Sequence, residues 1–334
     1  MKNIPIFSVA VITLAFAVNA CKTVTTPPDN TTTTPGWSAG NFGTTETILG
    51  VNFPAPQIGY ACGFNGTMLK TSDSGKTWSS LHAGAVGSEN LYRISFQDVM
   101  TGVAGGNDGT IVRTTDGGAT WSALSAPFNA GENIRDLVYS AHKIVVVGGM
   151  GAAEGFIMTS ADDGQTWNRA KETSGTIYSV SLQSSLSFTA AGIAGQIFRT
   201  TDFGLTWLDE SVTAAGDDFN ALDFFDANHG TTVSYYGTIY ASLDGGLIWT
   251  NQNSGLNKNP TNDGLLRTVK MLSLQEAWAA GESGTILHTT DGGSSWAQTS
   301  ISGTSTISWN QIAARDAHTL AFVGDNGTLY WLTE

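Results

Sequence analysis

A phrase of eight residues recurs six times along this chain of 334 residues and limits the folds that the chain can adopt. The phrase begins with Ser or Thr, has Asp at its third position and Gly at its fifth, and ends in Trp. Its copies span residues 71–78, 114–121, 160–167, 200–207, 242–249 and 289–296. Self-similarity at such a period is typical of an array of equivalent structural units.

A second signal precedes each phrase and occurs once more near the C-terminus. It is a Gly followed two residues later by Ile, Met or Leu, and successive copies are 40 to 47 residues apart. The seven glycines are Gly66, Gly109, Gly155, Gly195, Gly237, Gly284 and Gly327. Because this spacing matches one four-stranded blade, we predict an all-β fold, a seven-bladed β-propeller of four-stranded blades.

The seventh unit lacks the phrase and has no outer strand of its own. Trp37 is followed by small residues, much as the Trp of a phrase is. We therefore predict that residues 37–45 supply the outer strand of the blade begun by residues 309–332. Joining both ends of the domain in one sheet removes the free edges of an open array.

Alternating apolar residues place the strands within a unit. The inner strand is predicted at 92–96 and the third at 110–114, and the fourth begins near Trp121. The second strand is predicted at 102–106, with counterparts at 144–148, 188–192 and 277–281. Gly-containing turns separate these short strands, as in other all-β domains.

The Asp of the phrase is predicted to hold its own turn together. It can accept hydrogen bonds from main-chain N–H groups, its Gly can take a positive φ, and its Trp can cover the gap between blades. The six residues are Asp73, Asp116, Asp162, Asp202, Asp244 and Asp291. They lack the spaced carboxylates of a calcium loop, so we predict no metal site and no cofactor.

The N-terminus reads as a secretory leader over residues 1–21, with Lys2 followed by an apolar stretch. A small residue before Cys21 resembles the bacterial lipobox, which implies that Cys21 is lipidated; an ordinary signal peptide or a lone reactive Cys is the alternative. Residues 22–36, rich in Thr and Pro, form a predicted linker to the propeller at 37–334. We expect a protein anchored by lipid in the bacterial envelope, at the outer membrane, facing the periplasm or the cell surface.

Cysteine content and charge narrow the other possibilities. Cys62 occupies a second-strand position and is predicted to be a buried free thiol, which leaves no disulfide. The formal net charge is −13, and only 13% of residues are charged. Such a surface repels phosphate backbones, so nucleic acid is excluded as a partner.

A column of polar and aromatic residues stands two positions before the buried centre of each inner strand. It comprises Tyr92, Arg135, Tyr178, Asn220, Arg267 and Asn310, with Leu49 in the first blade. The loops between second and third strands, which include Tyr235, reach the same end of the channel. Residues 251–265, the longest insertion, should project over it, whereas Arg93 should face the other way. We predict that this face, and not the one bearing the repeated phrases, binds a partner; the alternative is that polar residues only solvate the strand ends.

The repeated phrase resembles the Asp-box, or BNR repeat, of sialidases and other propeller proteins. Residues 92–95 nearly match the sialidase Tyr-Arg-Ile-Pro signature, but Ser95 replaces its Pro, and sialidases have six blades. Xyloglucan-cleaving glycosidases carry Asp-boxes on two facing propellers, and their chemistry needs two carboxylates at a fixed separation. The candidate carboxylates are Asp108, Glu154, Asp217, Asp218, Glu282 and Asp325, among which the sequence selects no pair. A glycan-binding protein or a glycoside hydrolase is thus the alternative reading.

The unit at 96–121 resembles the repeat of the photosystem II stability/assembly factor family, and the likeness extends over residues 37–334. The resemblance implies a seven-bladed propeller that acts as a non-enzymatic assembly scaffold. We therefore predict an envelope lipoprotein that binds proteins or assists assembly. Its expected partner at the channel mouth is an envelope protein or an extended glycan, the membrane is contacted only through the lipid, and the protein is a monomer.

Overall fold

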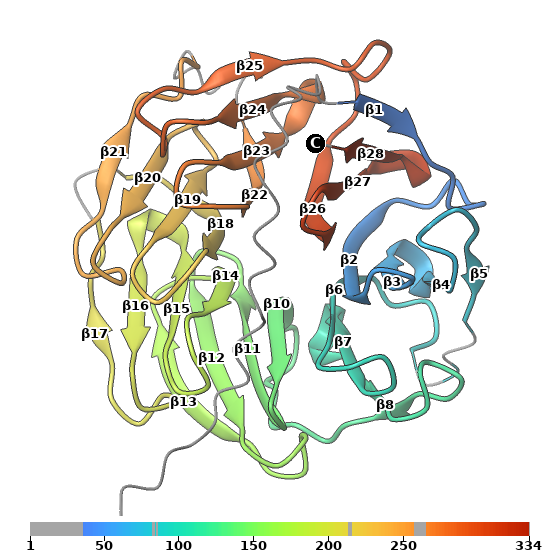
Figure 1. The fold of residues 1–334 in the computed structure, drawn as a ribbon. Helices are drawn as coiled ribbons and strands as arrows, with labels where there is room; N and C mark the ends of the chain where they lie inside the picture. The colour runs from blue at the N-terminus through green and yellow to red at the C-terminus, as the bar shows by residue number, and fades with distance from the viewer. Residues whose placement is uncertain (1–35, 82–83, 85, 213–215, 257–264, 334) are drawn as a thin grey trace, which may run out of the picture. The chain divides into compact units, whose positions relative to one another are not determined.

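The computed structural model describes residues 36–81, 84, 86–212, 216–256 and 265–333. These residues form seven four-stranded antiparallel sheets around a central channel (Figure 1). The all-β, seven-bladed prediction is confirmed. The predicted leader with Cys21 and the linker, apart from Gly36, lie outside the described residues. Within them, no helix is long and apolar enough to cross a membrane.

The inner strand of each blade lines the channel. These strands are β2 Ile48–Ala55, β6 Leu91–Phe96, β10 Asn133–Ser140, β14 Ile177–Leu182, β18 Phe219–Phe224, β22 Leu266–Met271 and β26 Trp309–Asp316. The second strands are β3 Ile58–Gly63, β7 Gly102–Gly106, β11 Lys143–Met150, β15 Phe188–Gly192, β19 Gly230–Ser234, β23 Ala277–Gly281 and β27 Thr319–Gly324. We number the blades 1 to 7 in this order.

The two remaining strands of each blade lie toward the rim. The third strands are β4 Met68–Thr71, β8 Ile111–Thr114, β12 Glu154–Ser160, β16 Ile197–Thr200, β20 Ile239–Ser242, β24 Ile286–Thr289 and β28 Leu329–Thr333. The outer strands are β5 Ser79–Ser80, β9 Ser122–Ala123, β13 Asn168–Thr173, β17 Leu208–Asp209, β21 Thr250–Gln252, β25 Ala297–Thr299 and β1 Gly36–Ala39. Inner strands begin at one face of the ring, which we call the mouth face. In blades 1 to 6 the third strand ends in an Asp-box at the opposite face, which we call the box face.

The N-terminal strand closes the ring, as predicted. β1 pairs antiparallel with β28, from Gly36 opposite Thr333 to Ala39 opposite Tyr330 (Figure 1). The strand is shorter than the predicted 37–45, because after Gly40 the chain turns inward to bury Phe42 between blades 7 and 1. Blade 7 therefore has four strands like the other blades, and β28 is paired on both edges.

The second strands at 102–106, 188–192 and 277–281 have the predicted bounds, but β11 is longer than 144–148. In blade 3, β11 and β12 stay paired as far as Met150 opposite Glu154. Five other blades turn earlier, through a short 3₁₀ turn at the mouth face: η1 Phe64–Gly66, η2 Asn107–Gly109, η3 Ile193–Gly195, η4 Glu282–Gly284 and η5 Asp325–Gly327. The middle residue of each turn has a φ between 49° and 57°.

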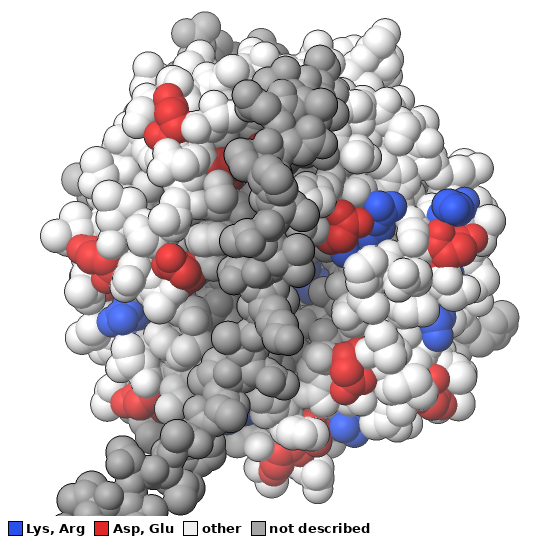
Figure 2. Space-filling view, viewed as in Figure 1, with Lys and Arg blue, Asp and Glu red and all other residues white. Residues whose placement is uncertain are grey.

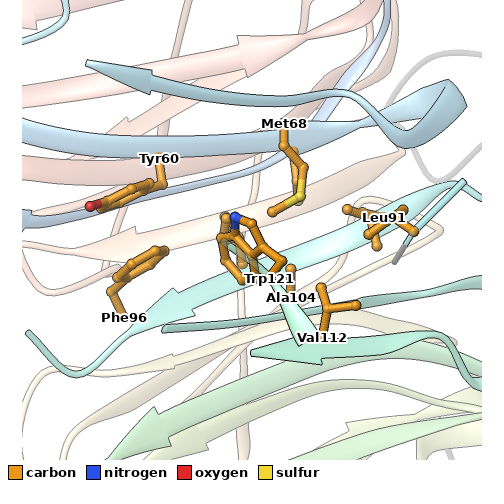
Figure 3. Close-up of a cluster of buried hydrophobic side chains, with 10 residues drawn as sticks. Tyr60, Met68, Leu91, Phe96, Ala104, Val112 and Trp121 are labelled. Atoms are coloured by element: carbon orange, nitrogen blue, oxygen red, sulfur yellow. The ribbon is translucent and has the colours of Figure 1, made fainter. Parts of the chain in front are cut away.

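The apolar core lies between neighbouring blades. Between blades 1 and 2, Tyr60 stacks on Phe96 with ring centroids 3.6 Å apart, and Trp121 packs edge-on against Phe96 (Figure 3). Cys62 is completely buried in the same cluster as a free thiol, as predicted. The Trp of the second Asp-box thus covers the gap between two blades, which confirms its predicted role.

Each Asp-box is held by its own side chains. In the first box, the Asp73 carboxylate accepts hydrogen bonds from the Thr77 N–H at 2.9 Å and the Thr77 hydroxyl at 2.6 Å. The Thr71 hydroxyl accepts the Gly75 N–H at 2.9 Å, and Gly75 has a φ of 80°. The hydrogen bond from the Thr77 side chain, with further bonds from the turn, lowers the pKa of Asp73 to about 2. The first box thus has the hydrogen bonds and the positive φ that the predicted folding role requires, and the role itself stays a prediction.

Side chains in the channel satisfy the free edges of the inner strands. Ser179 accepts the backbone N–H of Leu222 in the next blade at 3.1 Å, and Thr268 accepts that of Ile312 at 3.0 Å. An unpaired strand edge buried against a neighbour would otherwise leave its N–H groups without partners. These contacts fix the spacing of the inner strands and therefore the shape of the channel.

Candidate functional site

Every inner strand carries a β-bulge near its start. Its register with the second strand skips one residue in each of the seven blades. The skipped residues are Leu49, Tyr92, Arg135, Tyr178, Asn220, Arg267 and Asn310. A bulge leaves the extra residue unpaired and redirects its side chain. In each blade, one side chain near the channel mouth therefore does not follow the regular alternation of the inner strand.

These seven residues line a single cavity of about 370 Å³, which we call the mouth cavity. Since every blade contributes one residue, the cavity lies on the axis of the ring. The predicted Tyr235 lines it too, together with Arg93, Leu265 and Glu282. The structure thus brings together all the residues that the sequence singled out for binding; their role in binding stays a prediction. Of the insertion at 251–265, residues 257–264 lie outside the described residues.

Arg93 was expected to face away from the mouth, and that expectation is wrong. The bulge at Tyr92 breaks the alternation of β6, so that Tyr92 and Arg93 both reach the channel. The Arg93 guanidinium donates to the Leu49 carbonyl oxygen at 2.8 Å, and its Nε lies 3.2 Å from the Asp136 carboxylate. Burial raises the pKa of the Asp136 carboxyl, although the guanidinium beside it acts in the opposite direction.

The channel continues from the mouth cavity toward the box face as a second cavity of about 480 Å³. Arg93 lines both cavities and therefore lies at their boundary. The deeper cavity contains a second ion pair, in which the Lys270 ammonium lies 2.9 Å from the Asp223 carboxylate. The two ion pairs join blade 2 to blade 3 and blade 5 to blade 6, so they hold neighbouring inner strands together along the channel.

On one side of the mouth, the predicted residues are occupied with contacts between blades. Asn220 donates to the Leu266 carbonyl oxygen at 2.8 Å, and Asn310 donates to that of Ile48 at 3.0 Å. Arg267 donates to the Asn310 side chain at 3.0 Å. These three side chains join blades 5, 6, 7 and 1, and they hold the shape of the mouth.

The other side of the mouth, which we call its open side, is lined by Tyr92, Arg135, Tyr178 and Tyr235. The Arg135 guanidinium carbon lies 4.8 Å from the centre of the Tyr92 ring, a cation–π contact. Among the described residues, Arg135 Nε has no hydrogen-bond partner. Tyr178 is close enough that the Arg135 charge partly offsets the rise in its pKa caused by burial. Tyr235 stands exposed at the rim, edge-on to Tyr236.

The six candidate carboxylates, all of which lie in the described part of the chain, do not come together as a pair at the mouth. Of the six candidates, Glu282 alone lines the mouth cavity, and it forms an ion pair with Arg267. Asp217 is buried away from the cavity and accepts a hydrogen bond from Thr238 at 2.6 Å. In the part of the chain that the structure describes, no cluster of three or more His, Cys, Asp or Glu residues could hold a metal ion.

The fold is shared with several solved propellers. A structure of YCF48 bound to a D1 peptide superposes with a TM-score of 0.71 at 21% identity, over 89% of this chain and 97% of that one. YCF48 from Cyanidioschyzon merolae gives 0.72 at 17% identity, over 89% and 98%. A GH74 xyloglucanase from Xanthomonas campestris gives 0.69 at 15% identity, over 88% of this chain and 53% of the enzyme. A search of curated protein sequences finds no significant match.

The sequence also matches the family model of the photosynthesis system II assembly factor YCF48. The match covers residues 29–127 and 215–334, which include the N-terminal strand, blades 1 and 2, and blades 5 to 7. These segments make up more than half of the chain and contain both partners of the ring closure. The chain therefore belongs to the YCF48 family of photosynthesis system II assembly factors.

Proposed function

We propose that this protein is a non-enzymatic scaffold that holds a segment of a partner protein across the mouth of its propeller. The observation that carries the proposal is the set of seven bulges, which place one side chain per blade in a single cavity. Bulges at the same position in every blade favour a surface built for recognition.

The open side of the mouth suits a peptide. Tyr92, Arg135 and Tyr178 offer flat faces and hydrogen-bonding groups close together, and Arg and Tyr dominate the binding energy of many protein interfaces. Arg135 lines the mouth cavity, where its guanidinium can donate to a main-chain carbonyl or a carboxylate. The related YCF48 that was solved with a D1 peptide supports a protein ligand for this chain as well.

A glycan-binding or glycoside-hydrolase function is the second candidate. The structural likeness to a xyloglucanase supports it, since aromatic side chains at a channel mouth can also stack on sugar rings. Hydrolysis by a pair of carboxylates would need a partner for Glu282, whose carboxylate is engaged by Arg267. We therefore place protein binding first.

The test is affinity purification from an envelope extract, together with a glycan array. Wild-type protein is compared with Arg135→Lys, which keeps the charge, with Arg135→Ala/Arg267→Ala, and with Lys76→Ala, an exposed control on the box face. We expect a specific protein whose affinity falls about 30-fold in the double variant, equivalent to about 2 kcal/mol, and is unchanged in the control. A glycan that binds wild type but not the double variant would instead establish the second function. Turnover abolished by Glu282→Gln would make the protein an enzyme.

We also propose that the propeller is tethered in the bacterial envelope by lipid on Cys21. The lipobox-like sequence before Cys21 supports this, and the Thr- and Pro-rich segment after it suits an extended tether. Mass spectrometry of the mature N-terminus should find an acylated Cys21. A Cys21→Ser protein that still partitions with membranes would refute the anchor.

A further inference from the structure

The Asp-box of blade 5 differs from the other five. In those boxes, a hydroxyl group donates to the Asp carboxylate at 2.5–2.6 Å, from Thr77, Thr120, Thr166, Thr206 and Ser295. Blade 5 has Ile248 at this position, which has no hydroxyl, and the Asp244 carboxylate there accepts the N–H groups of Leu247 and Ile248 and the Ser242 hydroxyl. The fifth box has thus lost a stabilising bond and gained an aliphatic side chain that is 67% exposed.

The third strand of blade 5 has a short side chain at a position from which long basic side chains reach the next blade in blades 1 and 2. In blade 1, the Lys70 ammonium at this position donates to the Gly117 carbonyl oxygen of the neighbouring box at 2.7 Å. In blade 2, the Arg113 guanidinium lies 3.5 Å from the Asp163 carboxylate. Blade 5 has Ala241 instead, which is too short to cross the gap. The crevice between blades 5 and 6 therefore remains open on the box face.

An apolar groove occupies this crevice. It consists of an outer cavity of about 480 Å³ and a small inner cavity of about 20 Å³, which share Ala241, Leu243, Gln252, Gly292 and Gly293. Trp296 lines the inner cavity and Ile248 the outer one. The rim is unusually apolar, since Leu243 is 75% exposed and Leu274, in the first loop of blade 6, is 44% exposed. Exposed aliphatic side chains around a concave surface mark an interaction site.

The charges around the groove indicate its ligand. Its described lining residues include the carboxylates of Asp244, which is bonded within its own box, and Glu276, which pairs with His288, together with His229 but no Lys or Arg. A second copy of this chain, with a net charge of −13, would be repelled, and so would an anionic bilayer. We propose that this groove binds a protein segment that presents aliphatic side chains flanked by Lys or Arg. It is a second binding surface, on the face opposite the mouth.

The test uses phage-displayed random dodecapeptides selected on the full-length chain. Ala241→Arg should fill the crevice as Arg113 does, and Ile248→Thr restores the hydroxyl of the other boxes, so neither should lower the melting temperature. Leu205→Ser is the matched control, because Leu205 is 80% exposed on the box of blade 4 and lines neither cavity. Arg135→Ala separates this site from the mouth.

We expect the selected peptides to share aliphatic residues flanked by Lys or Arg. They should bind Ala241→Arg and Ile248→Thr at least tenfold more weakly than wild type, and bind Leu205→Ser and Arg135→Ala equally well. Three outcomes would overturn the proposal: no peptide whose binding depends on Ile248, a dimer in analytical ultracentrifugation that Ile248→Thr dissociates, or binding to phosphatidylglycerol vesicles that Ile248→Thr abolishes.

Discussion

Replacement of Trp37 by Ala should weaken the whole propeller, because Trp37 anchors the strand that closes the ring. Its indole packs edge-on against Phe322, with centroids 4.9 Å apart, and against Trp278 at 5.9 Å. Each such pair contributes about 0.5–1.5 kcal/mol beyond burial, and truncation of a fully buried Trp costs about 3–5 kcal/mol. Since Trp37 is only partly buried, we expect the free energy of unfolding to fall by about 3 kcal/mol, which lowers the Tm by roughly 6 °C in a domain of this size.

Thermal and urea unfolding, followed by circular dichroism, measure this loss. Ser38→Ala is the matched control, because Ser38 lies on the same strand with an exposed side chain. Deletion of residues 22–45 should cost more, since it also removes the buried Phe42 and uncovers the edge of β28. A wild-type Tm in both Trp37→Ala and the deletion would refute the reasoning that β1 holds the ring closed.

Three further predictions concern the boxes and the core. Asp116→Ala should lower the Tm in thermal unfolding and leave the affinity of the folded protein for its partner unchanged in binding assays. A loss of affinity in fully folded protein would indicate that the partner binds the box face at Asp116. Hydrogen bonds within the turns, led by those from hydroxyl side chains, lower the pKa of the Asp73, Asp116, Asp202 and Asp291 carboxyls to about 2, so their stabilisation is present at neutral pH and lost as the pH falls from about 4 toward 2. An acid titration of Tm should show this decline, more weakly in Asp116→Asn than in wild type. Burial raises the pKa of the Cys62 thiol to about 12, so it should react with a thiol reagent only after unfolding; rapid reaction in the native protein would contradict its place in the core.

The seven-bladed ring could be predicted from the sequence because each repeat is marked by a short motif whose residues contact one another. The Asp-box contains its own hydrogen-bond partners, as the bonds between Asp73 and Thr77 illustrate, and the Gly before it ends a turn. The ring closure by the Trp37 strand could be predicted because the sequence contains seven of the Gly signals but six Asp-boxes. The bounds of β11 could not be predicted in the same way, because the length of a hairpin depends on how far two strands stay paired.

The mouth was predicted as a set of positions but not as a set of contacts. Spacing along the inner strands identified Tyr92 and Arg135, yet it gave no sign of the bulge that lets Arg93 join them. Pairing register is a property of two strands, so one strand's sequence does not determine it. For the same reason, the sequence did not distinguish Arg267, which is bonded to its neighbours, from Arg135, whose Nε is free of protein partners among the described residues. Only 13% of the residues are charged, and most of the described surface in Figure 2 is uncharged. The pattern of charges along the sequence therefore gave little help in separating Arg267 from Arg135.

Site-specific photo-crosslinking in living cells tests most directly whether the mouth holds a partner protein. A photoreactive benzoylphenylalanine replaces Tyr235, which is exposed at the rim of the mouth cavity, and in a separate strain replaces Lys76 on the box face of blade 1. We predict a discrete crosslinked protein from position 235 that disappears when Arg135→Ala is added, and no such species from position 76. The absence of any crosslink at 235, or the same product from both positions, would contradict the account.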